Sequence, residues 1–191
     1  MNEVNKYIDE NGVEITIEKR GNYPFVREIY SENGIKKHQK IYDNGKLSNI
    51  SFYAYSSNEI DVLVKNKKSV SVIFIYFNGV YEIKEYLDYF KNKLIEKRIS
   101  VSDKLDNLIC FRIYKLDNSI LIPIRTDKSY FVNEVQKYSF EYNEDGTIFM
   151  IYDEEFDEKI YPSDIGVNPN ETFTWESFEY YKCAEPLIPV N

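Results

Sequence analysis

Residues 29–47 read IYSENGIKKHQKIYDNGKL and contain two Asn-Gly pairs that lie 11 positions apart. Each pair follows an Ile-Tyr dipeptide and a short polar run. Asn-Gly tolerates the positive φ angles that a tight turn between antiparallel strands requires. The segments on either side of the second pair, 35–41 and 47–55, have the composition of strands. The stretch therefore predicts consecutive β-hairpins.

The same turn chemistry recurs along the whole chain. Five of the seven glycines follow Asn or Asp: Gly12, Gly34, Gly45, Gly79 and Gly146. Apolar residues alternate with polar ones beside these turns, and Asp117-Asn118 is a further turn candidate without glycine. We expect hairpin strands over 13–17, 35–41, 47–55, 108–116, 120–125, 138–142 and 148–152.

One segment has a different period. Between Tyr81 and Arg98 the apolar residues include Ile83, Leu87, Phe90 and Leu94, without any Gly or Pro. This spacing is typical of an amphipathic helix that packs on a sheet. The sequence thus predicts an α+β fold, mainly antiparallel β-sheet built from hairpins, with one long amphipathic helix at about 81–98. A short helix is expected near Trp175, Phe178 and Tyr181, docked by its aromatic side chains.

A polar run over 65–69 predicts a boundary within the chain. It separates a β-hairpin-rich region, 1–66, from an α+β region, 67–191, that contains an acidic final third. One continuous domain is the alternative, because a polar connection does not require two separate cores.

Charge is unevenly distributed. Residues 141–191 contain 2 basic and 13 acidic residues, whereas the whole chain has a net charge of −8. Such a region repels phosphates and favours a basic protein partner over nucleic acid or a membrane. A solvated surface without a partner is the alternative. The densest stretch supplies the predicted partner-binding residues, which are Asp153, Glu154, Glu155, Asp157 and Glu158.

Familiar catalytic and cofactor motifs are missing from the sequence. The only histidine, His38, lies among lysines, and strand alternation would place Lys36, His38 and Lys40 on one solvated face. Neighbouring positive charge lowers the pKa of a histidine and makes it a poor general base. Cys110 and Cys183 are 73 residues apart, which favours two buried free thiols. We therefore predict no catalytic residue, no metal site and no cofactor.

Two weaker chemistries stay open. Asp61, Glu82 and Lys84 resemble the acidic-plus-lysine set of Mg²⁺-dependent restriction-like nucleases, and 32 carboxylates could also include a glycosidase pair. Lys36, His38 and Lys40 near Phe52, Tyr53 and Tyr55 could also form a stacking platform for single-stranded nucleic acid. Aromatic residues at strand spacing more often form the core or cross-strand pairs, so we expect no nucleic acid partner.

The segment from Arg27 to Tyr53, with its repeated Ile-Tyr, polar turn and Asn-Gly, resembles MORN-variant hairpin repeats of bacterial proteins. Some of those proteins are associated with toxin–antitoxin or immunity systems. No catalytic residues accompany such repeats, so the resemblance implies a binding role.

Together these observations predict a cytoplasmic, bacterial, non-enzymatic protein-binding protein. Its sharper form is an immunity or antitoxin-type inhibitor that covers a basic toxin with its acidic surface. The alternatives are a carboxylate-dependent hydrolase, either a glycosidase or a Mg²⁺-dependent nuclease, and a structural hairpin-repeat protein. The longest apolar run, 72–77, is far shorter than the roughly 20 residues needed to cross a bilayer, so no membrane association is expected.

Overall fold

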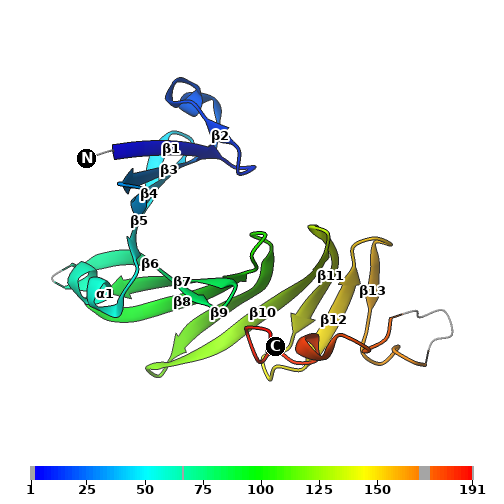
Figure 1. Cartoon of the computed structure of the whole chain (residues 1–191). Coiled ribbons are helices and arrows are strands. Elements are labelled where there is room, and N and C mark those ends of the chain that lie inside the picture. The colour runs from blue at the N-terminus through cyan, green and yellow to red at the C-terminus, as the bar shows by residue number, and fades with distance from the viewer. Residues whose placement is uncertain (1–2, 66, 168–172, 191) are drawn as a thin grey trace. The chain divides into compact units, whose positions relative to one another are not determined.

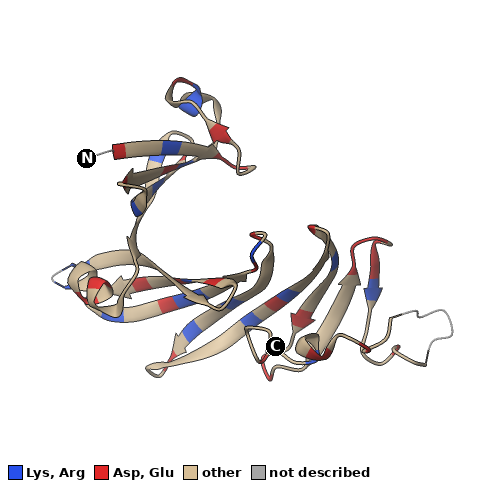
Figure 2. Cartoon of the chain, viewed as in Figure 1, with Lys and Arg blue, Asp and Glu red and all other residues tan. Residues whose placement is uncertain are grey.

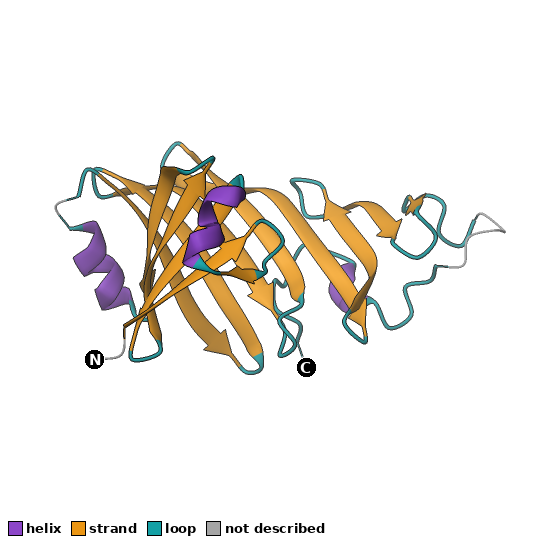
Figure 3. Cartoon of the chain, turned by 90° about the horizontal axis from the view of Figure 1, so that it is seen from above, coloured by secondary structure: helices purple, strands orange, loops and turns teal. Residues whose placement is uncertain are grey.

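The structure is a computed structural model that describes residues 3–65, 67–167 and 173–190. Strands make up 59% of the chain and helical segments 9%, so β-structure dominates (Figure 3). In the described residues the strands form a 13-stranded sheet in the order β13-β12-β11-β10-β9-β8-β7-β6-β5-β4-β3-β1-β2 (Figure 1). Except for the first two strands, neighbours in the sheet are neighbours in the chain. Apart from the parallel pair β5 and β6, the sheet is therefore built mainly from consecutive hairpins.

The elements have the following bounds: β1 Glu3–Asp9, β2 Glu14–Ile15, η1 Ile17–Asn22, β3 Phe25–Glu32, β4 Ile35–Asp43, β5 Lys46–Ala54, α1 Ser57–Val64, β6 Ser69–Asn78, β7 Tyr81–Phe90, β8 Lys93–Ser102, β9 Leu108–Asp117, β10 Ile120–Val132, β11 Val135–Tyr142, β12 Ile148–Asp153, β13 Glu158–Ile160 and η2 Glu179–Tyr181.

The chain divides into two compact units, with unit 1 comprising Met1–Ile75 and Tyr86–Ile95, and unit 2 comprising Tyr76–Glu85 and Glu96–Asn191. In unit 1, β1, β3, β4 and β5 pair antiparallel, and β5 pairs parallel with β6 through the crossover that contains α1. Its core contains Ala54, Val64, Val70, Val72 and Leu87.

Unit 2 contains two hydrophobic clusters on its sheet. The first is centred on Phe140 and Ile151 and is completed by Phe173 and Ala184 of the C-terminal segment. The second is centred on Ile83 and Val101, with partly buried residues of the same C-terminal segment packed against it. The last part of the chain therefore belongs to the core of unit 2, although η2 is its only regular element in the described residues.

The predicted hairpin turns are confirmed. All five predicted turn glycines have positive φ, and each lies between two strands that are consecutive in the chain and adjacent in the sheet. They are Gly12, Gly34, Gly45, Gly79 and Gly146. At 118–119 the glycine-free turn is made by residues with φ of 46° and 71°. Local turn chemistry thus specifies most of the topology. The strand expected over 13–17 is shorter, because only Glu14–Ile15 pairs with β1 and η1 follows it.

The long helix predicted at 81–98 is wrong, and with it the α+β assignment. The segment is the hairpin of β7 and β8, and Lys91 and Asn92 form its turn with φ of 48° and 62°. Ile83 and Leu87 are both buried and four residues apart. A spacing of four places two side chains on one face of a helix and also on one face of a strand, so these two residues fit both periods. The turn contains neither Gly nor Pro, so no local signal in the sequence indicates that the segment reverses there.

The one α-helix of the described residues, α1, was not predicted. Its signal is present in the sequence as Ser56-x-x-Glu59, a capping box. The Glu59 amide donates to Ser56 Oγ at 3.4 Å, and the Tyr55 amide donates to Glu59 Oε2 at 2.7 Å. Near Trp175, the expected short helix is only the three-residue 3₁₀ turn η2. The predicted docking by aromatic residues is confirmed, since Phe178 and Tyr181 contact Tyr130 at ring centroid distances of 5.0 and 5.9 Å.

A bulge in the β3–β4 hairpin corrects the predicted basic face. Tyr30 lies opposite His38, whereas Ser31 lies opposite Lys36, so Lys37 is an extra residue in β4. Such an extra residue reverses the side-chain alternation beyond it. Lys36 therefore does not share the face of His38, and its Nζ lies 5.9 Å from the Tyr53 ring centroid instead.

Candidate functional site

The acidic stretch predicted to bind a partner forms the turn between β12 and β13. Asp153 is only 7% exposed, and its Oδ1 accepts from the amides of Glu155 at 2.9 Å and Phe156 at 3.1 Å. Its carboxylate therefore holds the turn and does not belong to the exposed surface. Asp157 has a φ of 58°, which completes the sharp reversal.

The four remaining predicted residues are exposed and gather at this turn, which is red in Figure 2. Several are held by neighbours on the sheet. Glu154 accepts from Gln136 at 2.8 Å and from Ser139 at 2.6 Å, and Lys137 pairs with Glu155 at 2.6 Å. Tyr152 donates to Asp157.

An apolar residue missed by charge-based reasoning stands among these carboxylates. Phe156 is 68% exposed at the centre of the turn, with Glu155 and Asp157 on either side of it. Aromatic side chains are enriched at protein interfaces, where they act as anchors. The turn thus combines an exposed aromatic ring, a carboxylate rim and a backbone fixed by Asp153. The phenylalanine among five acidic residues in Asp-Glu-Glu-Phe-Asp-Glu is the sequence signal that could have identified this anchor.

A second feature surrounds His38 in unit 1. The Tyr30, His38 and Phe52 rings lie in a row across β3, β4 and β5, with centroid distances of 4.9 Å and 6.2 Å. Burial and the charge of Lys40 lower the pKa of His38, so its imidazole is neutral at pH 7. The row is not in the core, because all three side chains line a cavity of about 1040 Å³.

This cavity, called the aromatic pocket below, is bounded by the β3–β4 hairpin, the end of β5 and the start of α1. The structure brings the aromatic residues of the sequence-based stacking hypothesis together here, but Lys40 does not line the pocket, and Lys37 does so in place of Lys36. Its lining residues are Tyr30, Glu32, Gly34, Ile35, Lys37, His38, Phe52, Tyr53, Tyr55, Asn58, Glu59, Val62 and Leu63.

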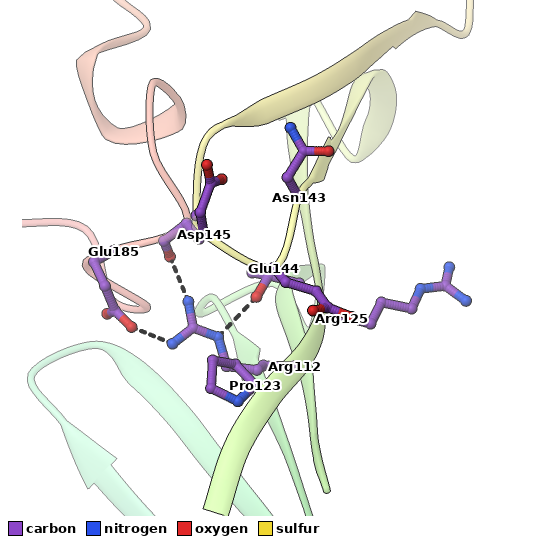
Figure 4. A pocket seen from close by; sticks show the side chains of 10 residues that line it. Arg112, Pro123, Arg125, Asn143, Glu144, Asp145 and Glu185 are labelled. Atoms are coloured by element: carbon purple, nitrogen blue, oxygen red, sulfur yellow. Dashed lines mark hydrogen bonds and ion pairs between the residues drawn. The ribbon is translucent and has the colours of Figure 1, made fainter.

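Two buried cations in unit 2 bind the C-terminal segment. Arg112 donates through Nε to Thr126 Oγ1 at 2.8 Å, through Nη2 to the Ala184 carbonyl at 2.9 Å, and through Nη1 to Glu185, at one side of a cavity of about 120 Å³ (Figure 4). Lys128 donates to the carbonyls of Tyr180 and Cys183 at 2.7 and 2.8 Å. These bonds fix the segment in place, so we assign both residues a structural role.

The two cysteines differ in environment. Cys110 is buried, as predicted, whereas Cys183 is exposed, which corrects the expectation of two buried thiols. Burial raises the pKa of Cys110 to about 11 and lowers that of Lys128 to about 8. Neither group is therefore in its reactive form at neutral pH.

The carboxylates of the weaker hydrolase hypotheses are spread over the chain. Asp61 lies on α1 in unit 1, whereas Glu82 and Lys84 form an ion pair on β7 in unit 2.

Sequence reasoning missed another pair of carboxylates. Asp127 and Glu141 lie directly opposite each other on β10 and β11, and both line a cavity of about 270 Å³ together with Phe111 and Arg125. Burial raises the pKa of Asp127, although the Arg125 guanidinium, 2.7 Å from Asp127 Oδ2, opposes that rise.

Within the described ranges, no three His, Cys, Asp or Glu side chains come together in a way that could hold a metal ion. The helical segments in that part of the chain are all too short or too polar to cross a membrane.

Comparisons with protein families, with curated proteins and with solved structures find no match to this chain.

Proposed function

We propose that the protein acts without catalysis, in the cytoplasm, by binding a basic protein through the acidic turn between β12 and β13. In its sharper form, this is an immunity or antitoxin-type inhibitor that covers a basic surface of a toxin. The partner is recognised by charge and by one apolar contact. The resemblance of residues 27–53 to hairpin repeats of immunity-associated proteins is consistent with this role.

The observation that carries the proposal is Phe156, exposed among carboxylates on a turn whose backbone is fixed by Asp153. A turn whose backbone is already fixed loses little backbone entropy when the ring that it carries enters a partner's pocket. The surrounding carboxylates accelerate encounter with a positively charged surface and exclude partners of like charge. The alternative, a surface that only keeps the protein in solution, would explain the exposed carboxylates but not the exposed Phe156 ring.

The test compares the parent chain with a variant in which Glu154, Glu155, Asp157 and Glu158 are changed to Lys. A basic protein captured by the parent chain is purified, and its association rate is measured at low and at physiological ionic strength. We expect the variant to associate at least about tenfold more slowly at low salt and to lose most of the salt dependence. The melting temperature should fall only slightly, because the contacts that the variant loses with Gln136, Lys137, Ser139 and Tyr152 are exposed, and each such contact contributes about 0 to 1 kcal/mol.

A matched control changes four exposed carboxylates of unit 1, Glu10, Glu18, Asp43 and Asp61, to Lys. Both variants have the same net charge, so net charge alone would slow both equally. The proposal requires a larger effect at the β12–β13 turn. It also requires Phe156→Ala to increase the dissociation rate. Equal rates for parent and turn variant at low salt would refute it.

A carboxylate-dependent hydrolase is the second candidate, favoured by Asp127 and Glu141. Like charges directly opposite on adjacent strands destabilise a sheet. A pair of carboxyl groups in a cavity is also the machinery that glycoside hydrolysis uses. Hydrolysis of a glycan or nucleic acid panel by the parent chain, abolished by Asp127→Asn and retained by the distant Asp61→Asn, would support this candidate. No turnover by the folded parent chain would exclude it for those substrates.

A further inference from the structure

A cavity of about 270 Å³ in unit 1, called the Arg20 pocket below, is lined in part by η1. η1 is the short blue coil beside β2 in Figure 1, and the start of β3, the end of β4 and the β4–β5 turn complete the lining. The Arg20 pocket and the aromatic pocket share no lining residue. Arg20 is the one charged residue among the described residues that line it. The cavity therefore places a single guanidinium among uncharged groups.

The Arg20 side chain is held in place without using its hydrogen-bond donors. Its guanidinium carbon lies 4.8 Å from the Tyr42 ring centroid, and its Nη1 lies 4.0 Å from Glu28 Oε2. The second distance is that of an ion pair and is too long for a hydrogen bond. Within the described residues the Arg20 side chain donates no hydrogen bond, and 41% of it is exposed. Its N–H groups are therefore available to a ligand.

The charges around Arg20 leave an excess of one positive charge. Glu28 is only 7% exposed, and Lys40 Nζ lies 3.6 Å from its Oε1. The Tyr42 hydroxyl donates to Glu28 Oε2 at 2.9 Å, and burial together with this bond raises the pKa of Tyr42. One buried carboxylate thus faces two cations, Arg20 and Lys40. Of these two cations only Arg20 lines the cavity, so the pocket attracts an anion.

The remaining walls are mostly apolar. Val26 is 2% exposed and Ile17 is 55% exposed, and Tyr23 and Tyr42 add two aromatic residues. The Tyr23 hydroxyl has no hydrogen-bond partner in the described part of the chain. Apolar walls beside a guanidinium favour a ligand with an anionic end and an apolar body. A strongly hydrated anion such as phosphate gains nothing from those walls.

We propose that the Arg20 pocket binds the carboxylate of a small apolar acid. The guanidinium pairs with the carboxylate through two parallel N–H donors, and the apolar body of the ligand contacts Ile17, Val26 and Tyr23. Arginine suits this role because its planar fork matches the two oxygens of a carboxylate. A free aryl acid and the C-terminal carboxylate of a polypeptide that ends in an apolar residue present the same chemistry. The site lies wholly within unit 1 and does not depend on the acidic turn of unit 2.

The test is an NMR titration of the full-length chain at pH 7 with phenylacetate, an ionised acid with an apolar ring. The matched ligand is phenylacetamide, which has nearly the same shape and no charge. We expect saturable shifts of amides within 17–26 and 42–45 with phenylacetate, and an affinity at least about fivefold weaker with phenylacetamide. Inorganic phosphate serves as the hydrated anion and should bind more weakly than phenylacetate.

A peptide pair distinguishes the two sources of the carboxylate. Acetyl-Ala-Ala-Phe is titrated with a free C-terminus and as its amide. Saturable shifts of the same amides with the peptide acid but not with its amide would assign the pocket to polypeptide ends. Binding of phenylacetate without binding of the peptide acid would assign it to free acids.

Arg20→Gln should weaken phenylacetate binding at least about fivefold, and Arg20→Lys, which keeps the charge but loses the paired donors, should weaken it less. Lys19→Gln removes the neighbouring positive charge outside the lining and should have no effect. Glu28→Gln should strengthen binding about two- to fivefold, because it removes the carboxylate that competes for Arg20 while its amide oxygen still accepts from Tyr42. A purely structural pair of Glu28 and Arg20 would not give this gain.

Melting temperatures identify the variants that fold. Equal affinity for phenylacetamide, equal losses for Arg20→Gln and Lys19→Gln, preferential binding of phosphate or an absence of saturable shifts at these amides would overturn the proposal. Weaker binding by a folded Glu28→Gln variant would overturn it as well.

Discussion

At the scale of single residues, the two cysteines provide a direct check on burial. Cys183 is exposed and Cys110 is buried with a raised pKa. In the folded protein at pH 8, we expect one thiol to react rapidly with a disulfide reagent and the second to react only after denaturation. Cys183→Ser should remove the fast phase, and Cys110→Ser should leave it unchanged. Two fast thiols in the folded parent chain would contradict this placement of Cys110.

The raised pKa of Cys110 also has a pH-dependent effect on stability. An unfolded chain releases this proton near pH 8.5, whereas the folded chain retains it until about pH 11. The folded state therefore binds more protons between these values, so this thiol's contribution to the free energy of unfolding is full below pH 8.5 and is lost as the pH rises towards 11. Urea denaturation should show a smaller loss for Cys110→Ser than for the parent chain over this range.

At the scale of elements, α1 depends on its first turn. Removing the hydroxyl that accepts from the Glu59 amide, by Ser56→Ala, should lower the free energy of unfolding by about 1 kcal/mol. Ser57→Ala is the matched control, because Ser57 is the first helical residue and is exposed. Urea denaturation measures both. A smaller effect of Ser56→Ala than of Ser57→Ala would show that the cap does not stabilise α1.

The elements also show where sequence reasoning succeeded and where it failed. Turns at Gly34 and Gly45 were predictable because Asn-Gly and its φ requirement are local properties. β7 and β8 were mistaken for a helix because the turn at Lys91 and Asn92 uses positive φ without glycine. Strand pairing depends on neighbours distant in the sequence, so periodicity alone did not distinguish the two structures.

At the scale of the whole molecule, the sequence predicted the charged residues of the acidic turn, whereas it predicted only some of the residues of the aromatic pocket. Charge counts located Glu154 to Glu158, because net charge is a property of composition. The pocket depends on a bulge at Lys37 and on α1, and neither follows from simple alternation. The sequence identified His38, Phe52, Tyr53 and Tyr55 of this pocket, but it missed Tyr30 and wrongly added Lys36 and Lys40.

Core packing in unit 2 can be tested with two Phe→Ala variants. Phe178 contacts Tyr130 and Phe173 at ring centroid distances of 5.0 and 5.1 Å, so Phe178→Ala should lower the free energy of unfolding by about 2 to 4 kcal/mol. Phe156→Ala should change it by less than about 0.5 kcal/mol, because Phe156 is exposed. Chemical denaturation of both variants checks the difference. Similar losses would contradict the docking of the C-terminal segment.

The strand order has a consequence for folding during synthesis. From β3 to β13, each strand lies in the sheet beside the strand made just before it, so pairing requires short loop closures, apart from the longer crossover through α1 between β5 and β6. The growing chain can therefore add hairpins in the order in which they leave the ribosome. The exception is the final segment, whose Phe173 and Ala184 complete the cluster around Phe140. Nascent chains that lack this segment should expose apolar surface and engage chaperones until the last residues are made.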